Sequence, residues 1–455
     1  MLSTTNVEKK GDLSSVFVHL GALPPTLESR FVDLKKSIAP KDPAVLEDAY
    51  RRVLAQLENE TQEIKHLGPA CIPQIEFADI QKNNGCIPPD RIAEIKKRGV
   101  VVIRGLISPE EAAAYKDQLY RCIERHRDTL VGFPENDPQA WELYYTRAQV
   151  SARSHPNWTM ASVAMNQLWH STPEAKVDLT RTVAYCDRLR VRKPGDTSFA
   201  LSAHVDGGSV ERWEDPEYRQ CYRQIFAGKW EQHDPYDVTH RIEANMDMYD
   251  SPGGCSAFRI FQGWLSLSHV EPNGGTLRVC PLTQEPMAYI LMKPLLKENL
   301  DKSDLLGSWP GRCSDITKEN HPHIIDAMVS IPTVAPGDAV FWHCDQVHAV
   351  EPKNESDRDS TVLYIPSVPV CERNSRYLQR QRACFEKGLT PPDFPANHCE
   401  QYFDETDRAT VSTLTDNERR SLGLAPLEIS DASLLTPGQS HAIETHHRIL
   451  GLSPL

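Results

Sequence analysis

The spacing of hydrophobic residues changes along the chain, from a helical period at the front to short β-rich runs further on. Asp42 and Pro43 are typical of a helix start, and the periodic apolar positions that follow predict a helix ending near Gly68. A short helix is expected at 89–99, and a strand rich in β-branched residues at 100–107. The front of the chain is therefore expected to be mainly helical around a first strand.

A further helix start lies directly after that strand. Ser108 and Glu111 have the spacing of a capping box, with Pro109 in the first turn, which predicts a helix from about 109 to 126. From Arg181 onward, short β-rich runs are separated by Gly, Pro, Asn and Asp, a texture typical of a sandwich or barrel rather than a parallel sheet. The pattern predicts an α+β protein with a β core and N-terminal and peripheral helices.

This pattern divides the chain into four expected segments. Residues 1–40 are polar and proline-punctuated and are expected to be extended, and 41–180 form the helical N-terminal part with the first strand. Residues 181–370 are the expected β core, and 371–455 a C-terminal extension packed on that core.

Composition narrows the class of protein. With 455 residues the chain can bury a large core, and its formal net charge of -13, without a basic cluster interleaved with aromatics, argues against nucleic acid as a partner. No apolar run is long enough for a membrane span, and the twelve cysteines show no regular spacing. We expect a cytoplasmic protein with reduced thiols, no membrane partner and a small-molecule substrate. Its oligomeric state stays open.

His-x-Asp pairs occur at three places, and their surroundings differ. His126 lies in a charged helical run and is expected on a solvated helix face. His204 and Asp206 instead follow an extended apolar run and precede two glycines, as expected for a strand that leads into an open turn. Two imidazoles and one carboxylate can bind Fe(II) and leave three positions for other ligands. His204 and Asp206 are therefore candidate metal ligands.

The third ligand is expected within residues 337–352, GDAVFWHCDQVHAVEP, which contain His343 and His348. Five positions apart, the two side chains lie on opposite faces of a regular strand, so they cannot both bind one metal. The residues alone leave the choice between them open.

Several blocks, in their order along the chain, resemble the phytanoyl-CoA-hydroxylase-like branch of the Fe(II)/2-oxoglutarate-dependent dioxygenases: VVVIRGLISPEEAAAYKDQL, HVD, EPNGGTLRVCPL and GDAVFWHCDQVHAVEP. The blocks PACIPQIEFADI, HVDGGSVERW, FRIFQGW and FWHCDQVHAVEP look more closely like the YbiU-like group of that branch. The resemblance runs from about residue 30 to about residue 400. It implies a double-stranded β-helix, or jelly-roll, core that brings the HxD strand beside a late strand with the third ligand.

The resemblance also implies the parts of the site. In the family the last ligand lies eleven positions after the Gly of its GD segment, here Gly337, which selects His348 over His343. Fe(II) is the implied cofactor, and 2-oxoglutarate and O2 the implied co-substrates. Arg358, ten positions after His348, is the implied partner of the far carboxylate, with Arg259 as the alternative.

Both arginines also have structural interpretations. Arg358 could be a loop arginine paired with Asp357 or Asp359, and Arg259 could pair with Asp187. The sequence does not decide between these interpretations and a role in binding 2-oxoglutarate.

Weaker candidates concern the substrate. Arg212 could meet an acidic substrate or form a surface salt bridge, while Trp213 and Trp264 could line the pocket or pack in the core. Specificity is expected from the segments at about 131–170, 207–250 and 283–328, whose polar side chains include Arg147, Arg153, Asn166, Arg223 and His240.

The expected activity is hydroxylation of a small acidic or amino-acid-like metabolite by an Fe(II)/2-oxoglutarate-dependent dioxygenase, in specialised metabolite biosynthesis. Asp206 at the carboxylate position disfavours halogenation, because no position is left for a halide. The alternatives are the same chemistry on an apolar natural-product intermediate and a non-catalytic, cupin-like binding or sensing protein. A zinc hydrolase is a third reading, for which no HExxH motif is present.

Overall fold

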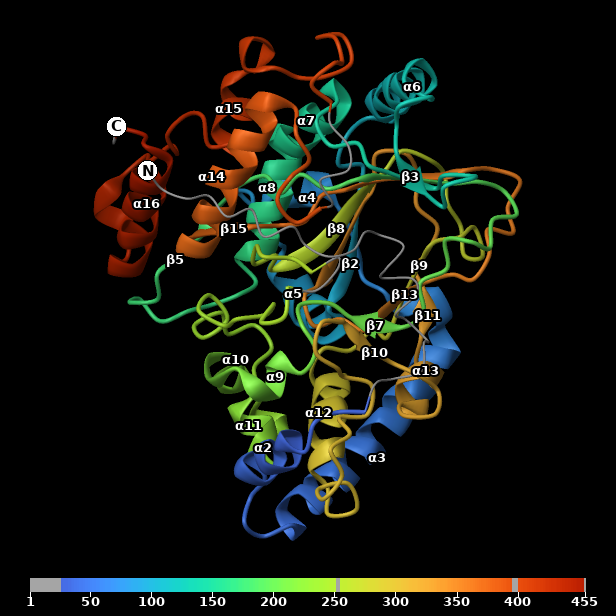
Figure 1. The fold of residues 1–455 in the computed structure, drawn as a ribbon, viewed down its shortest axis with the longest axis vertical. Helices are drawn as coiled ribbons and strands as arrows, with labels where there is room; N and C mark the ends of the chain where they lie inside the picture. Colours follow the sequence, from blue (N-terminus) through green and yellow to red (C-terminus); the bar gives the residue numbers. More distant parts are fainter. Residues whose placement is uncertain (1–25, 251–253, 395–399, 454–455) are drawn as a thin grey trace.

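The computed structural model describes residues 26–250, 254–394 and 400–453, which form two β-sheets surrounded by helices (Figure 1). The protein is thus of mixed α+β class, as the sequence predicted. One hydrophobic core runs through both sheets and takes residues from Leu27 to Phe403, so it joins all four expected segments.

The larger sheet has eight strands, and Val100–Arg104, the first strand predicted from the sequence, lies second from one edge. In spatial order they are β1 (Gln74–Glu76), β2 (Val100–Arg104), β12 (Ala339–His343), β8 (Phe261–Ser266), β14 (Ser360–Tyr364), β6 (Leu189–Arg192), β4 (Ala140–Trp141) and β3 (Gly132–Phe133). β1 and β2 run parallel, and the other neighbours are antiparallel.

The smaller sheet has five short antiparallel strands. Their order is β10 (Ser314–Asp315), β7 (His204–Val205), β13 (His348–Val350), β9 (Leu277–Val279) and β11 (Val329–Ser330). A separate pair is formed by β15 (Pro369–Cys371) and β5 (Val177–Thr182). Between β6 and β14 the chain passes repeatedly between the sheets: β6, β8, β12 and β14 belong to the larger, and β7, β9, β10, β11 and β13 to the smaller.

Side chains of the two sheets meet between them. The ring of Trp342 on β12 lies 5.5 Å from the ring of His348 on β13. Arg192 on β6 donates from Nη1 to the carbonyl of Glu351, directly after β13, at 2.5 Å. The inner faces of the two sheets therefore share one interior.

The helical predictions for the front of the chain are confirmed, with one correction. The helices here are α2 (Arg30–Ile38), α3 (Ala44–Leu67), α4 (Phe77–Lys82), α5 (Pro89–Arg98) and α6 (Pro109–Arg125). Ser108 caps α6 by accepting a bond from the Glu111 amide at 3.1 Å, whereas the Glu111 side chain accepts from Tyr115 instead of completing the capping box. The extended state expected for 1–40 is wrong for α2, and residues 1–25 lie outside the described part.

Helix α2 forms because one of its faces packs on the rest of the protein. Phe31 is buried, and the equally buried Lys35 donates to the carbonyls of Asn299 at 2.7 Å and Asp304 at 3.0 Å. The polar composition of residues 1–40 gives no indication of these contacts.

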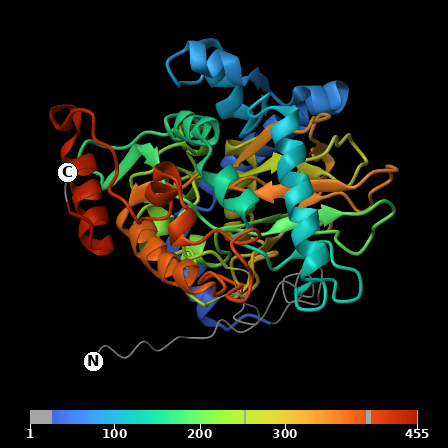
Figure 2. The ribbon, with the colours of Figure 1, turned by 90° about the horizontal axis from the view of Figure 1, so that it is seen from above.

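The remaining helices surround the sheets. They are α7 (Arg147–Ser154), α8 (Pro156–Asn166), α9 (Glu211–Glu214), α10 (Pro216–Cys221), α11 (Arg223–Phe226), α12 (Gln284–Met292), α13 (Pro322–Asp326), α14 (Glu372–Lys387), α15 (Asp416–Ser421) and α16 (Pro437–Leu450). The C-terminal helices gather on one side of the molecule (Figure 2), where Ser375 of α14 bonds His446 of α16 at 2.9 Å. None of the described helices is both long enough and apolar enough to cross a membrane.

Candidate metal centre

His204 and His348 are direct cross-strand partners. β7 and β13 run antiparallel with His204 opposite His348, so both side chains leave the same face of the smaller sheet. Asp206 follows two residues after His204, and the potential ligand atoms of the three residues lie within 4.8 Å of one another. His204 Nε2 is 3.6 Å from Asp206 Oδ1, and His348 Nε2 is 3.7 Å from Asp206 Oδ2.

The turn after β7 fixes the position of Asp206. Gly208 has a φ of +89°, and a Cβ there would lie 2.7 Å from the carbonyl oxygen of Met246, so only glycine fits. Arg212 donates to the carbonyls of Asp206 at 2.6 Å and Gly208 at 2.7 Å. The guanidinium thus holds the turn from which the carboxylate projects.

Backbone hydrogen bonds set the tautomer of both histidines. The Nδ1 atom of His204 lies 2.7 Å from the carbonyl oxygen of Ser202, and that of His348 lies 2.9 Å from the carbonyl oxygen of Gln346. A carbonyl only accepts, so in each ring Nδ1 carries the proton and donates. In the neutral form of each ring, Nε2 then presents its lone pair toward Asp206, the arrangement usual for metal-binding histidines.

Electrostatics favours the metal-binding protonation states. Burial alone raises the pKa of Asp206, but His204, His348 and Arg259 outweigh it and lower that pKa to about 2. Burial and the neighbouring His204 lower the pKa of His348 to about 4. At neutral pH Asp206 is therefore ionised and His348 neutral, the forms that bind a metal without first losing a proton.

Arg259 lies beside this group, just before β8. Its Nη2 is 4.0 Å from Asp206 Oδ2 and its Nη1 is 3.9 Å from Asp187 Oδ2, so the pairing with Asp187 considered from the sequence is present. Its guanidinium lies 5.4 Å above the Tyr185 ring. These separations are longer than hydrogen bonds, and no described residue accepts a hydrogen bond from this guanidinium, so its donors are available to a ligand next to Asp206.

The structure does not bring Arg358 to the three ligands. Its side chain is 66% exposed, and its Nε lies 3.5 Å from Asp357 Oδ1. This corresponds to the loop interpretation, because β14 begins only at Ser360 and leaves Arg358 outside the sheet. In this position Arg358 is not the buried cation that a far carboxylate requires.

The three weaker substrate candidates are all buried. Trp213 is fully buried and donates from Nε1 to the carbonyl of Leu291 at 3.2 Å, so it packs in the core and does not line the site. Arg212 is 1% exposed, braces the turn and pairs with Asp345 at 3.5 Å, so the salt bridge considered from the sequence is present but buried. Trp264 lies two residues after Gln262 on β8, and both side chains leave the same face of that strand.

Gln262 and Trp342 complete the surroundings of the ligands. Gln262 contributes to the low pKa of Asp206, although its buried Nε2 has no hydrogen-bond partner among the described residues, and Trp342 is the direct partner of Gln262 across β8 and β12. Trp342, whose ring lies 5.5 Å from His348, was not singled out from the sequence. Its place depends on how the two sheets pack, which no local pattern reports.

His343, the competing ligand, has both ring nitrogens engaged. Its Nε2 lies 3.0 Å from the carbonyl oxygen of Pro235, its Nδ1 accepts from the Asp345 amide at 3.1 Å, and the ring stacks on Trp169 at 4.7 Å. His343, Cys344 and Asp345 form a second group with metal-ligand spacing among the described residues. Asp345 is already paired with Arg241, which makes this group a poor site for a cation.

A third such group consists of Cys122, His126 and Asp407. His126 Nε2 lies 2.8 Å from Asp407 Oδ2, where Arg125 Nη1 also binds at 2.7 Å. The His126 ring stacks on Phe403 at 3.7 Å, so the expectation of a solvated helix face is wrong. Arg125 already supplies the positive charge that a metal would bring.

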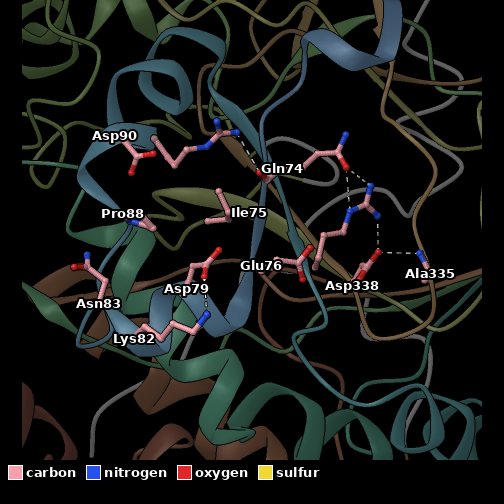
Figure 3. A pocket seen from close by; sticks show the side chains of 12 residues that line it. Gln74, Ile75, Glu76, Asp79, Lys82, Asn83, Pro88, Asp90, Ala335 and Asp338 are labelled. Atoms are coloured by element: carbon pink, nitrogen blue, oxygen red, sulfur yellow. Dashed lines mark hydrogen bonds and ion pairs between the residues drawn. The ribbon is translucent and has the colours of Figure 1, made fainter.

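A hollow of about 860 Å³ lies elsewhere, along β1 and β2 (Figure 3). Its cations have partners within the hollow or at its edge: Arg104 pairs with Asp338 at 2.6 Å, Lys82 with Asp79 at 3.2 Å, and Arg91 with Glu94 at 3.3 Å. None of its lining residues belongs to the groups with metal-ligand spacing. The three-ligand group therefore remains the candidate site.

Comparisons with known proteins identify the relatives of this chain. A family model described as Gig2-like matches residues 25–424. The uncharacterized protein YbiU of Escherichia coli (strain K12) is 35% identical over 377 residues, which cover 80% of this chain and 88% of YbiU. These matches confirm the YbiU-like part of the expected resemblance.

Solved structures agree with the sequence match. GlcNAc Inducible Gene 2 (GIG2) from Candida albicans has a TM-score of 0.84 at 27% identity and covers 94% of this chain and 96% of its own. A provisionally named oxidoreductase from Salmonella typhimurium LT2 has a TM-score of 0.78 at 31% identity and covers 88% of this chain and 98% of its own. The chain belongs to the Gig2-like family.

Proposed function

We propose that this protein is an Fe(II)- and 2-oxoglutarate-dependent oxygenase. The observation that carries the proposal is the cross-strand pair of His204 and His348, with both Nε2 atoms free and directed at the ionised Asp206. Two imidazoles and one carboxylate on one face are the ligand set of non-haem iron oxygenases. The provisional oxidoreductase name of the Salmonella relative points to the same broad class.

The order of the strands supports a double-stranded β-helix as the scaffold. β6, β14, β8 and β12 are neighbours in one sheet, β7, β13, β9 and β11 are neighbours in the other, and the chain passes between them. Such winding places β7 next to β13 although 144 positions separate His204 from His348 (348 minus 204). We interpret the two sheets as this fold, and we propose the phytanoyl-CoA-hydroxylase-like branch from the sequence blocks that resemble it.

His204, Asp206 and His348 would hold the iron. When bound with 2-oxoglutarate, the metal supplies from O2 the oxidising power that removes hydrogen from a substrate. The Ser202 and Gln346 carbonyls keep each Nε2 in its metal-binding form. All three ligand side chains are at most 30% exposed, which limits the access of bulk water.

Arg259 would act at the same end of the site as the metal. Its guanidinium, 4.0 Å from Asp206, stabilises the carboxylate and offers donors to an anionic group placed next to the ligands. A buried cation therefore lies beside the carboxylate ligand.

This charge favours a small acidic or amino-acid-like substrate. Several other cations named from the sequence are neutralised by the chain itself: Arg147 pairs with Glu418 at 3.5 Å and His240 with Glu217 at 3.0 Å. Arg153 donates to two backbone carbonyls. Arg212 is engaged by the Asp206 and Gly208 carbonyls, whereas Arg259 faces the Asp206 carboxylate, so the substrate proposal rests on Arg259. An apolar natural-product intermediate is the competing class.

A binding or sensing protein without turnover would keep the same residues. Such a protein would bind its ligands without consuming 2-oxoglutarate, whereas an oxygenase consumes it. A zinc hydrolase differs in needing neither O2 nor 2-oxoglutarate.

The test is release of succinate from 2-oxoglutarate with Fe(II) and O2. We expect succinate only when both are present, and none from the Asp206→Ala protein. A panel of amino acids, small carboxylates and apolar metabolites then identifies the class that stimulates release. Stimulation by the apolar set alone would contradict the acidic substrate, and no succinate under any condition would contradict the oxygenase.

A further inference from the structure

Three arginines follow one another at alternate positions on and just before β6. Arg188, Arg190 and Arg192 are two residues apart, so their side chains leave the same face of the strand. Arg192 reaches the carbonyl of Glu351, directly after β13, so this face is turned toward the smaller sheet. The three cations therefore project into the interior that also contains His348.

Arg190 lies close to the strand that carries His348. Its guanidinium is 5.9 Å from the centre of the Phe199 ring, and Phe199 packs with Val350 in one small apolar cluster. Val350 follows His348 by two positions, so both side chains leave the same face of β13. The Phe199 ring thus connects Arg190 on β6 with Val350, which lies two residues after the candidate ligand His348 on β13.

The three arginines differ in their counter-charges. Arg188 has Glu142 and Asp187, each at 3.6 Å, and Arg192 has Asp196 at 2.8 Å. Arg190 is only 2% exposed, yet within the described residues no carboxylate lies at ion-pair distance from it.

The hydrogen bonds of Arg190 are also incomplete. Its one side-chain bond, from Nη2 to Ser360 Oγ, is 3.4 Å long, and its Nε has no hydrogen-bond partner. A buried guanidinium without a counter-ion is costly, so this position is suited to an anionic ligand.

The register of the larger sheet turns Arg190 toward the candidate ligands. Arg190 pairs with Val362 on β14, and Val362 pairs with Ser266 on β8, so these side chains leave the same face as Gln262, four residues from Ser266. β6 lies two strands from β8, which is roughly 10 Å across the sheet. The two carboxyl carbons of a five-carbon diacid are about 5 Å apart, and hydrogen bonds at each end extend that reach. Arg259, 4.0 Å from Asp206, lies at the metal end of this span.

We propose that Arg190, with the Ser360 hydroxyl, binds the far carboxylate of 2-oxoglutarate in place of Arg358. Ser360 accepts from Arg190 and keeps its own proton for a second bond to the ligand. The planar guanidinium can bind a carboxylate through two nitrogens. This inference rests on the proposed function, because it names the residue that selects the co-substrate of that site.

The test compares 2-oxoglutarate with 2-oxopentanoate, which has the same chain and 2-oxo acid end but no far carboxylate. Calorimetric titrations without oxygen, on protein loaded with Mn(II), give both affinities. In the wild-type protein 2-oxoglutarate should bind more tightly. Arg190→Gln should weaken 2-oxoglutarate by about tenfold or more and leave 2-oxopentanoate nearly unchanged, since only a charge-assisted bond is lost. Arg190→Lys, which keeps the charge, should recover part of the preference.

Arg358→Gln is the matched comparison, since it removes the arginine that the family resemblance implied. Under the proposal it retains the preference for 2-oxoglutarate. Arg190→Gln should also unfold at the same or a higher temperature than the wild-type protein without ligand, because it removes an unpaired buried charge.

The outcomes distinguish failure of the Arg190 assignment from failure of the proposed oxygenase function. Loss of the preference in Arg358→Gln, with its retention in Arg190→Gln, would overturn the role of Arg190 and leave the oxygenase intact. Failure of the metal-loaded wild-type protein to bind 2-oxoglutarate would overturn both. Equal weakening of both 2-oxo acids in Arg190→Gln and Arg190→Lys would also reject the assignment, because it would show a structural role.

Discussion

Replacing His348 and His343 separately by alanine distinguishes metal binding from packing. His348→Ala removes one of three ligand atoms. Loss of a residue that merely orients a ligand costs about 10–100-fold in metal affinity, so loss of the ligand itself should cost about 100-fold or more, about 2.7 kcal/mol. Among the described residues the His348 ring makes one hydrogen bond, from Nδ1 to the Gln346 carbonyl, so the effect on stability should be smaller than for His343.

His343→Ala should have the opposite profile. It removes the stack on Trp169 and leaves the Asp345 amide and the Pro235 carbonyl without their partner. Each unsatisfied buried group costs about 1–3 kcal/mol, so the two should lower the free energy of unfolding by roughly 2–6 kcal/mol. Metal affinity should stay within about twofold of wild type.

The assay is titration of each purified protein with Fe(II) under nitrogen, paired with chemical denaturation of the metal-free protein. Loss of the metal by His343→Ala, with its retention by His348→Ala, would show that His348 is not the ligand. Equal loss of the metal by both variants at matched stability would also refute the reasoning.

Three further predictions follow from the surroundings of the site. Gln262→Leu should lower metal affinity by less than about tenfold, because Gln262 contributes to the low pKa of Asp206 but its Nε2 has no hydrogen-bond partner among the described residues, and a larger loss in a Fe(II) titration would contradict this. Asp345→Ala should lower the free energy of unfolding by about 3–5 kcal/mol in chemical denaturation, since it leaves Arg241 and Arg212 buried without their carboxylate, and an unchanged midpoint would contradict this. Burial lowers the pKa of His343 to about 3, so below pH 6.5 the unfolded chain takes up a proton that the folded protein refuses, and stability falls with pH. Between pH 7.5 and 5.5 this residue should account for about 1.4 kcal/mol, and His343→Gln should lose that much less than wild type over the same range, whereas parallel pH profiles would contradict the assignment.

Local sequence signals were sufficient where the structure depends on local chemistry. The helix after Pro43, the strand at Val100 and the helix capped by Ser108 are all present because period, β-branching and capping act over a few residues. The turn at Gly208 was likewise visible, since a positive φ and a close backbone contact require glycine.

Long-range packing set the limit of the sequence analysis. The sequence could not show that Arg358 stops short of β14, whereas Arg190, on the neighbouring strand, is turned inward. Alternating arginines in a strand usually indicate a solvated face, and only the smaller sheet lying across β6 reverses that reading. His126 is a similar case, because its stack on Phe403 joins residues far apart in the chain.

The position of bound iron in a crystal structure shows whether His204, Asp206 and His348 are its ligands. Crystals grown without oxygen in the presence of Fe(II) would show it through anomalous scattering at the iron absorption edge. We predict one peak about 2.0–2.2 Å from Nε2 of His204, Nε2 of His348 and a carboxylate oxygen of Asp206. A peak at the His343 group or the His126 group instead, or no peak at the three predicted ligands in metal-saturated crystals, would contradict the account.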